Sequence, residues 1–157
     1  MRPRVYFSFD RENDLYRACS VLFSVRDVVC PAEGFFSAPG EDQATSIARI
    51  ELNLERTAVT VVLIGSNTSQ CSRVDDELRL SVARGNALLG LYIHHMGEHG
   101  EREAPRGAKP LLPGDVWFPA YDWEWDVKHF GEAVESAAGQ SARRRRSRPI
   151  YFPALGW

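Results

Sequence analysis

Residues 59–65 read Val-Thr-Val-Val-Leu-Ile-Gly, an unbroken apolar run rich in β-branched side chains. A run without polar alternation is typical of a strand whose two faces are both covered by helices, as in a parallel sheet. Parallel neighbours need long crossover connections, so helices should alternate with strands along the chain. The run therefore predicts an α/β domain built around a parallel sheet.

The rest of the chain supports this prediction, because strand-like and helix-like patterns alternate five times. Strands are expected at 4–9, 59–64, 87–93 and 116–121, with a weak second strand at either 28–30 or 35–36. Apolar residues at helical spacing predict helices at 13–24, 43–57, 72–85 and 127–139. We predict one flavodoxin-like three-layer domain over residues 1–139, with a five-stranded parallel sheet flanked by helices. Residues 140–157 are expected to form an Arg-rich tail with an apolar carboxyl-terminal segment.

Composition narrows the function classes. With 44% hydrophobic and 25% charged residues and no run long enough to span a bilayer, we expect a cytoplasmic protein without a membrane partner. The formal charge is −2, but five arginines lie within 143–148, and the other residues hold 14 basic against 21 acidic side chains, or −7. A body this acidic disfavours binding to a nucleic-acid backbone. The three cysteines are widely spaced, which indicates reduced thiols and no metal site.

The loops that follow the first and third strands place polar side chains at the carboxyl edge of the predicted sheet, where open α/β folds bind ligands. Ser8, Phe9 and Asp10 come from the first strand, and Asn67 follows the third. Phe9 is a candidate to stack on an aromatic ring of a ligand, while Ser8, Asp10 and Asn67 are candidates to bind hydroxyls or phosphates. Capping and core roles are the alternatives for each.

Glu77 stands one turn into the helix that follows the third strand, beside the same edge. Its spacing puts it on the margin of an apolar stripe, where partial desolvation would raise the pKa of its carboxyl group. An exposed glutamate that pairs with Arg73 or Arg84 is the alternative. The stripe consists of Val74, Leu78 and Val82.

Several other chemistries lack their motifs. The chain contains no GxGxxG or GxxxxGK[ST] loop for a pyrophosphate and no GxSxG nucleophile elbow. A phosphoreceiver needs an aspartate at the end of the third strand, where this chain has Gly65-Ser66-Asn67.

Taken in order, several short segments resemble the TIR-like domain family that includes the ThsB-type TIR proteins of Thoeris anti-phage defence systems. The resemblance covers about residues 3–139. It rests on segments 4–10 with Asn13 and Asp14, 58–68, 74–78, 90–94, 107–110 and 120–123. The Ile-His, Gly-x-x-Pro and Tyr-Asp-Trp motifs in the last three separate this branch from ordinary TIR domains.

The resemblance implies an enzyme that breaks the bond between nicotinamide and ribose in NAD+, with NAD+ as substrate and no further cofactor. The family's catalytic glutamate falls on Glu77. The product implied is a cyclic or otherwise modified ADP-ribose that signals to a downstream effector after a phage-derived trigger. Because TIR domains commonly act in assemblies, a homo-oligomer is also implied.

The chain departs from many of these relatives beside the acid. Their Trp-x-x-Trp-Glu pattern is replaced here by Arg73 and Asp76 in front of Glu77. Asp76 is expected to border the substrate site and to raise the pKa of Glu77 by adding negative charge. The loss of both tryptophans also keeps open a non-catalytic TIR-like interaction module, and a housekeeping flavodoxin-like nucleotide-binding protein is a third possibility.

Overall fold

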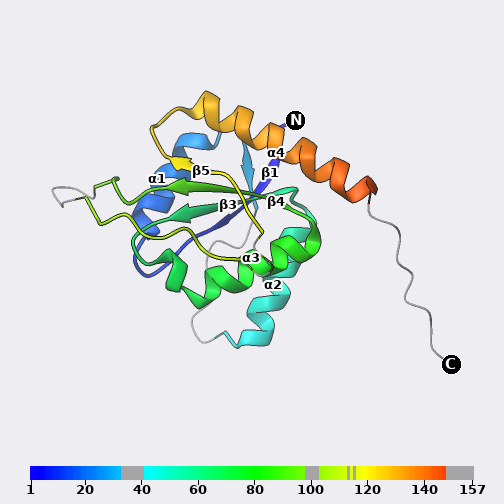
Figure 1. Cartoon of the computed structure of the whole chain (residues 1–157), viewed down its shortest axis with the longest axis horizontal. Helices are drawn as coiled ribbons and strands as arrows, with labels where there is room; N and C mark the ends of the chain where they lie inside the picture. The colour runs from blue at the N-terminus through cyan, green and yellow to red at the C-terminus, as the bar shows by residue number, and fades with distance from the viewer. Residues whose placement is uncertain (33–40, 98–102, 113, 115, 148–157) are drawn as a thin grey trace.

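The computed structural model describes residues 1–32, 41–97, 103–112, 114 and 116–147 (Figure 1). The alternative second strand at 35–36 and the apolar segment 148–157 lie outside these residues. The elements follow in the order β1 (Arg4–Ser8), α1 (Leu15–Val25), β2 (Cys30–Pro31), α2 (Gln43–Glu55), β3 (Val59–Ile64), a 3-10 turn (Thr68–Gln70), α3 (Ser72–Arg84), β4 (Ala87–Tyr92), β5 (Ala120–Asp122) and α4 (Val127–Ser147).

The five strands form one parallel sheet in the order β2-β1-β3-β4-β5, which confirms the predicted fold class. β1 and β3 are neighbours; β2 lies beside β1 on one side, and β4 and β5 follow β3 on the other side. The order therefore reverses between β1 and β3, and loops that leave these two strands diverge there. Such a switch point is where open α/β sheets form their ligand crevice.

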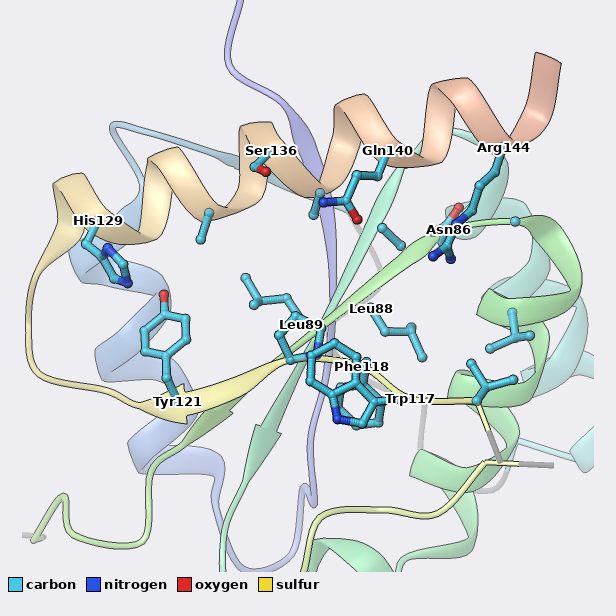
Figure 2. A pocket seen from close by; sticks show the side chains of 17 residues that line it. Asn86, Leu88, Leu89, Trp117, Phe118, Tyr121, His129, Ser136, Gln140 and Arg144 are labelled. Atoms are coloured by element: carbon cyan, nitrogen blue, oxygen red, sulfur yellow. The ribbon is translucent and has the colours of Figure 1, made fainter. Parts of the chain in front are cut away.

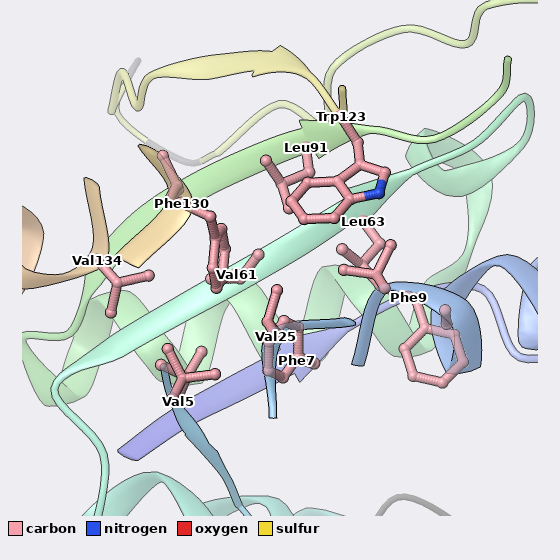
Figure 3. Packing of buried hydrophobic residues seen from close by; sticks show 14 of the residues in the cluster. Val5, Phe7, Phe9, Val25, Val61, Leu63, Leu91, Trp123, Phe130 and Val134 are labelled. Atoms are coloured by element: carbon pink, nitrogen blue, oxygen red, sulfur yellow. The ribbon is translucent and has the colours of Figure 1, made fainter. Parts of the chain in front are cut away.

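Helices cover both faces of the sheet, with α1 and α4 on one face and α2 and α3 on the other (Figure 1). Every residue of β3 is buried, as expected for a central strand between two helix layers. On the face of α1 and α4 the core is continuous and rich in aromatic rings (Figure 3). Phe7, Phe130 and Trp123 lie in it, and the Trp123 and Phe130 rings meet edge to face at 6.0 Å.

The carboxyl end of β3 is closely packed, and this explains the Gly-x-x-Pro motif. A Cβ atom at Gly107 would lie 2.1 Å from the carbonyl oxygen of Gly65. At Gly65 a Cβ atom would lie 2.1 Å from the carboxylate of the buried Asp14. The loop at 103–112 can thus approach β3 only because position 107 lacks a side chain, and Asp14 can pack against β3 only because position 65 lacks one.

The last helix differs from the prediction at its carboxyl end. The expected end of the last helix at Gly139 is wrong, because α4 continues to Ser147. Ser141 is buried and donates a hydrogen bond to the carbonyl oxygen of Gly85 at 2.7 Å, which anchors this continuation to the body. None of the helices within the described ranges has both the length and the apolarity needed to cross a bilayer.

Candidate functional site

Glu77 lies on the buried face of α3, and its expected place on the margin of that face is wrong. The residues of α3 that are buried are Val74, Glu77, Leu78 and Ser81, whereas Val82 is half-buried. Ser81 makes this partly polar face possible, because its hydroxyl lies 2.8 Å from the Thr60 hydroxyl of β3 and donates to the Glu77 carbonyl at 2.7 Å. The helix ends at Gly85, which adopts the left-handed conformation with φ of 82° that ends helices readily.

Two arginines hold the Glu77 carboxylate. Its side chain is 0% exposed, and its Oε1 accepts hydrogen bonds from Arg11 Nη1 at 3.0 Å and from Arg73 Nε at 3.3 Å. The other oxygen, Oε2, meets no hydrogen-bond donor in good geometry among the described residues. A buried, incompletely partnered carboxylate is costly in a folded protein and is a frequent mark of function.

The surroundings raise the pKa of the Glu77 carboxyl group above its usual range. Burial is the largest cause, and the charges of Arg11 and Arg73 and a hydrogen bond from the Tyr6 phenol act in the opposite direction. Burial and the neighbouring Glu77 charge in turn raise the pKa of Tyr6, so its hydroxyl stays protonated and able to donate. Burial, rather than the Asp76 charge that the sequence suggested, is thus the main cause of the shift at Glu77.

A cavity of about 540 Å³ opens at the switch point beside these groups. It is lined by Asp10, Arg11, Glu12, Asn13, Asn67, Gln70, Cys71, Ser72 and Arg73. These residues come from the loops after β1 and β3 and from the first turn of α3. Glu77 does not line the cavity, whereas both of its arginine partners do. Arg11 and Arg73 thus contact the carboxylate and also belong to the wall of the cavity.

The structure brings some of the predicted site residues to this cavity and keeps others away. Asp10 and Asn67 line it, and Asn67 is exposed. Ser8 and Phe9 are completely buried and do not line it; Phe9 belongs to the aromatic core. Asp76 is half-buried on α3 and does not line it either.

The carboxylate of Asp10 is engaged locally. Its Oδ1 accepts from the backbone N–H groups of Glu12 and Asn13 at 3.1 and 3.3 Å, and its Oδ2 accepts from Asn13 Nδ2 at 2.7 Å. These bonds fix the turn after β1. The same turn directs Arg11 toward Glu77, with its guanidinium 4.8 Å from the centre of the Phe9 ring.

Arg11 and Tyr6 are the site residues that the sequence analysis did not identify. Arg11 directly follows Asp10 at the end of β1, so its place in the chain was a usable signal. Tyr6 alternates with Phe7 on β1 and therefore faces the α2 and α3 side, where Glu77 lies. Only the packing of α3 against β1 shows that these side chains converge.

A second cavity, of about 630 Å³, lies between α4, β4 and the segment before β5 (Figure 2). Trp117, which is 75% exposed, Phe118 and Leu88 contribute to its apolar wall, and Gln140 of α4 points toward it (Figure 2). It shares no described lining residue with the first cavity, and none of its described lining residues is Asp or Glu. The acid-containing site is therefore the smaller cavity at the switch point.

Comparison with known proteins identifies a family. A family model described as "Thoeris protein ThsB, TIR-like domain" matches residues 6–98, which include the second half of β1, the Glu77 helix and β4. A Bacillus cereus (strain MSX-D12) protein named "Putative cyclic ADP-D-ribose synthase ThsB1" is 29% identical over 119 residues. That match covers 71% of this chain and 62% of the relative, so the chain accounts for less than two thirds of the relative's length.

A solved structure supports the fold alone. A conserved protein from Enterococcus faecalis V583 aligns with a TM-score of 0.51 and 10% sequence identity, over 87% of this chain and 99% of that protein. The family match extends over more than half of the chain and includes every residue of the Glu77 site named above. This chain therefore belongs to the family of Thoeris ThsB proteins with a TIR-like domain.

Proposed function

We propose that this protein cleaves the bond between nicotinamide and ribose in NAD+ and that Glu77 is the catalytic residue. The observation that carries the proposal is a buried carboxylate with a raised pKa, directly behind a cavity at the switch point of the sheet. The name of the Bacillus cereus relative, a cyclic ADP-D-ribose synthase, supports the same reaction class. A cavity of about 540 Å³ is within the usual range for a small-molecule site.

One carboxylate is sufficient for this chemistry. Nicotinamide in NAD+ is a cationic leaving group, so the C1′–N bond can break with its electron pair moving to the ring nitrogen and without a general acid. The ribose then has oxocarbenium character, as in glycoside hydrolysis. A carboxylate that faces the developing cation and accepts hydrogen bonds from the ribose hydroxyls stabilises the transition state more than the ground state.

The fate of the cation determines the product. Attack by an adenine nitrogen of the same molecule, with loss of one proton, gives a cyclic ADP-ribose and neutral nicotinamide. Attack by water gives linear ADP-ribose and one proton. A closed cavity that excludes water favours the internal attack. We propose a cyclic ADP-ribose-type product that signals to a separate effector in anti-phage defence.

The test uses the purified protein with NAD+ and follows nicotinamide and both ADP-ribose products by mass spectrometry. Wild type should release nicotinamide, and Glu77→Gln should reduce the rate by at least 100-fold while the fold is retained. Asp75→Asn is the matched control, because Asp75 lies on the same helix in an exposed pair with Arg79. Unchanged nicotinamide release by Glu77→Gln would refute the assignment.

A second candidate function is a non-catalytic TIR-like interaction module. It is favoured by one observation, that Arg11 and Arg73 keep the Glu77 carboxylate out of the cavity. Calorimetry with NAD+ separates the two candidates. An enzyme must bind NAD+, and its Glu77→Gln variant should still do so, whereas a pure scaffold binds none.

A further inference from the structure

We propose that Arg11 and Arg73 form the binding site for the diphosphate of the substrate. When the diphosphate binds, the two arginines give up their hydrogen bonds to Glu77 and bind the phosphates, which releases the catalytic carboxylate. This inference rests on the proposed function. It adds that the enzyme should prefer a dinucleotide substrate over a nicotinamide nucleoside, which has no phosphate.

Each arginine has two neighbours that compete for it. On one side is Glu77 Oε1, at 3.0 Å from Arg11 and 3.3 Å from Arg73. Both residues also line the cavity, and their side chains are 17% and 24% exposed. They come from different elements, one from the end of β1 and one from the first turn of α3, and converge on a single carboxylate oxygen. A ligand in the cavity meets both guanidinium groups at once.

The rest of the cavity suits an anion with hydroxyl groups nearby. Asn13, Asn67, Gln70 and Ser72 offer amide and hydroxyl donors, and the 13-residue helix α3 begins at its wall. The amino end of a helix carries partial positive charge and free N–H groups. No side chain caps this end of α3. Guanidinium groups pair with phosphate oxygens in a planar, two-bond geometry, so the two arginines supply the main anion contacts.

Two acidic residues also line the cavity, and the geometry limits their effect. The Asp10 carboxylate accepts three hydrogen bonds from its own turn, which orient its oxygens toward Glu12 and Asn13. Glu12 is exposed and can keep its charge in solvent. Asp10 is thus a buried carboxylate on the cavity wall, but hydrogen bonds from its own turn already engage both of its oxygens.

The exchange makes chemical sense at Glu77. Once phosphates take the guanidinium groups, the buried carboxylate loses both partners of Oε1. The Tyr6 phenol remains beside it, and Oε2 has no donor in good geometry among the described residues. Ribose hydroxyls and the developing cation at C1′ then become its natural partners. One NAD+ molecule carries both new partners, a diphosphate for the arginines and a reacting ribose for Glu77. Nicotinamide riboside has the ribose but no phosphate, so it offers a partner only to Glu77.

The binding experiment does not depend on activity and uses inorganic pyrophosphate as the probe in calorimetry. Glu77→Gln should bind pyrophosphate at least about 10-fold more tightly than wild type, because the carboxylate no longer competes for the arginines. Arg73→Met and Arg11→Met should each weaken binding by roughly 10- to 100-fold, the usual size of a lost charge-assisted bond. Arg79→Met is the matched control, since Arg79 lies on the same helix and pairs with Asp75 at the exposed surface. Equal affinity in wild type, Glu77→Gln and Arg73→Met would overturn the proposal.

The kinetic experiment compares kcat/KM for NAD+ and for nicotinamide riboside. In Arg73→Met the value for NAD+ should fall by at least 10-fold, while the value for nicotinamide riboside should stay constant or rise, because Glu77 is less tightly held. A merely structural role for Arg73 would lower both values together and would contradict the proposal. If wild type cleaves no NAD+ even with an extract of phage-infected cells added, the proposed function fails, and the pyrophosphate titration still decides whether the arginines and Glu77 compete.

Discussion

Arg73 stands one helical turn before Glu77 on α3 and donates its Nε–H to the Glu77 carboxylate across 3.3 Å. The Arg73 side chain thus covers the acid. Arg11 contacts the same oxygen from the turn after β1. Glu77, Arg11 and Arg73 therefore form one charge cluster, and the burial of Glu77 affects both the stability of the fold and the chemistry of the site.

The first prediction concerns the pH dependence of stability at Glu77. Burial raises the pKa of this carboxyl above the value of about 4.3 that a glutamate has in an unfolded chain. Between these two values the folded state retains a proton that the unfolded state has released, so the free energy of unfolding falls as pH rises through this window. Glu77→Gln lacks this effect. Its stability relative to wild type should therefore increase as pH rises above about 4.3.

Urea denaturation at several pH values measures this difference, and taking wild type minus variant removes the contribution of other titrating groups, such as the buried Asp14. A difference that stays constant or reverses its slope between these pH values would contradict the raised pKa of Glu77.

The second prediction concerns Tyr6. Its phenol lowers the pKa of Glu77 by hydrogen bonding to it, and Tyr6 remains protonated because burial raises its own pKa. Tyr6→Phe removes the donor and should raise the pKa of Glu77 further. Carbon-detected NMR titration of the glutamate carboxyl groups, with Glu77→Gln to assign the signal, reads the shift directly. A lower or unchanged pKa in Tyr6→Phe would mean that the phenol does not support the charged form.

The third prediction compares two glycines. Gly107→Ala places a methyl group 2.1 Å from the Gly65 carbonyl oxygen, so the loop must move away from β3. We expect a loss of about 1–3 kcal/mol in the free energy of unfolding, as for other overpacked sites. Gly139→Ala is the matched control, because no atom lies within 4 Å of its added Cβ and α4 continues past it. This control should gain about 0.5–1 kcal/mol, since alanine favours a helix interior more than glycine.

Thermal or urea denaturation distinguishes the two glycine variants. A destabilised Gly139→Ala would argue against a continuous α4, and a neutral Gly107→Ala would argue against the close approach of the loop to β3.

The fourth prediction concerns the aromatic core. Phe130 is completely buried between Phe7 and Trp123, with ring centroids at 6.4 and 6.0 Å. Phe130→Ala should lower the free energy of unfolding by about 3–5 kcal/mol through lost burial and a residual cavity. Trp117→Ala is the comparison, because Trp117 is largely exposed and its loss should change stability much less. Comparable losses in both variants would contradict this assignment of the core.

Local patterns predicted most of the fold. The β-branched run at Val59–Ile64 required two covered faces, and the structure gives it helices on both. Gly85 ended α3 as expected, because its left-handed φ suits glycine. At Gly139 the same residue type was misread as a stop. There the backbone remains helical, and the long-range bond from Ser141 to Gly85, which a local pattern cannot show, holds the continuing helix against the body.

The site was predictable only in part, because its contacts, too, join residues that are far apart in the sequence. The position of Glu77 after a buried strand placed it near the carboxyl edge, and the spacing of α3 placed it close to the apolar stripe. Its complete burial depends on Ser81 and Thr60, which supply a polar contact between helix and sheet. The cluster with Arg11 and Tyr6 depends on β1, more than 60 residues away, and no spacing within α3 contains that information.

The measurement that tests the central claim most directly is mass spectrometry of small molecules from phage-infected cells that carry the wild-type gene or Glu77→Gln, because infection supplies whatever trigger the protein needs. The account predicts an ADP-ribose-type product and free nicotinamide in wild-type cells, and neither above background in cells with Glu77→Gln at equal protein level. The same product at the same level in Glu77→Gln cells would contradict the claim that the Glu77 carboxylate performs the reaction.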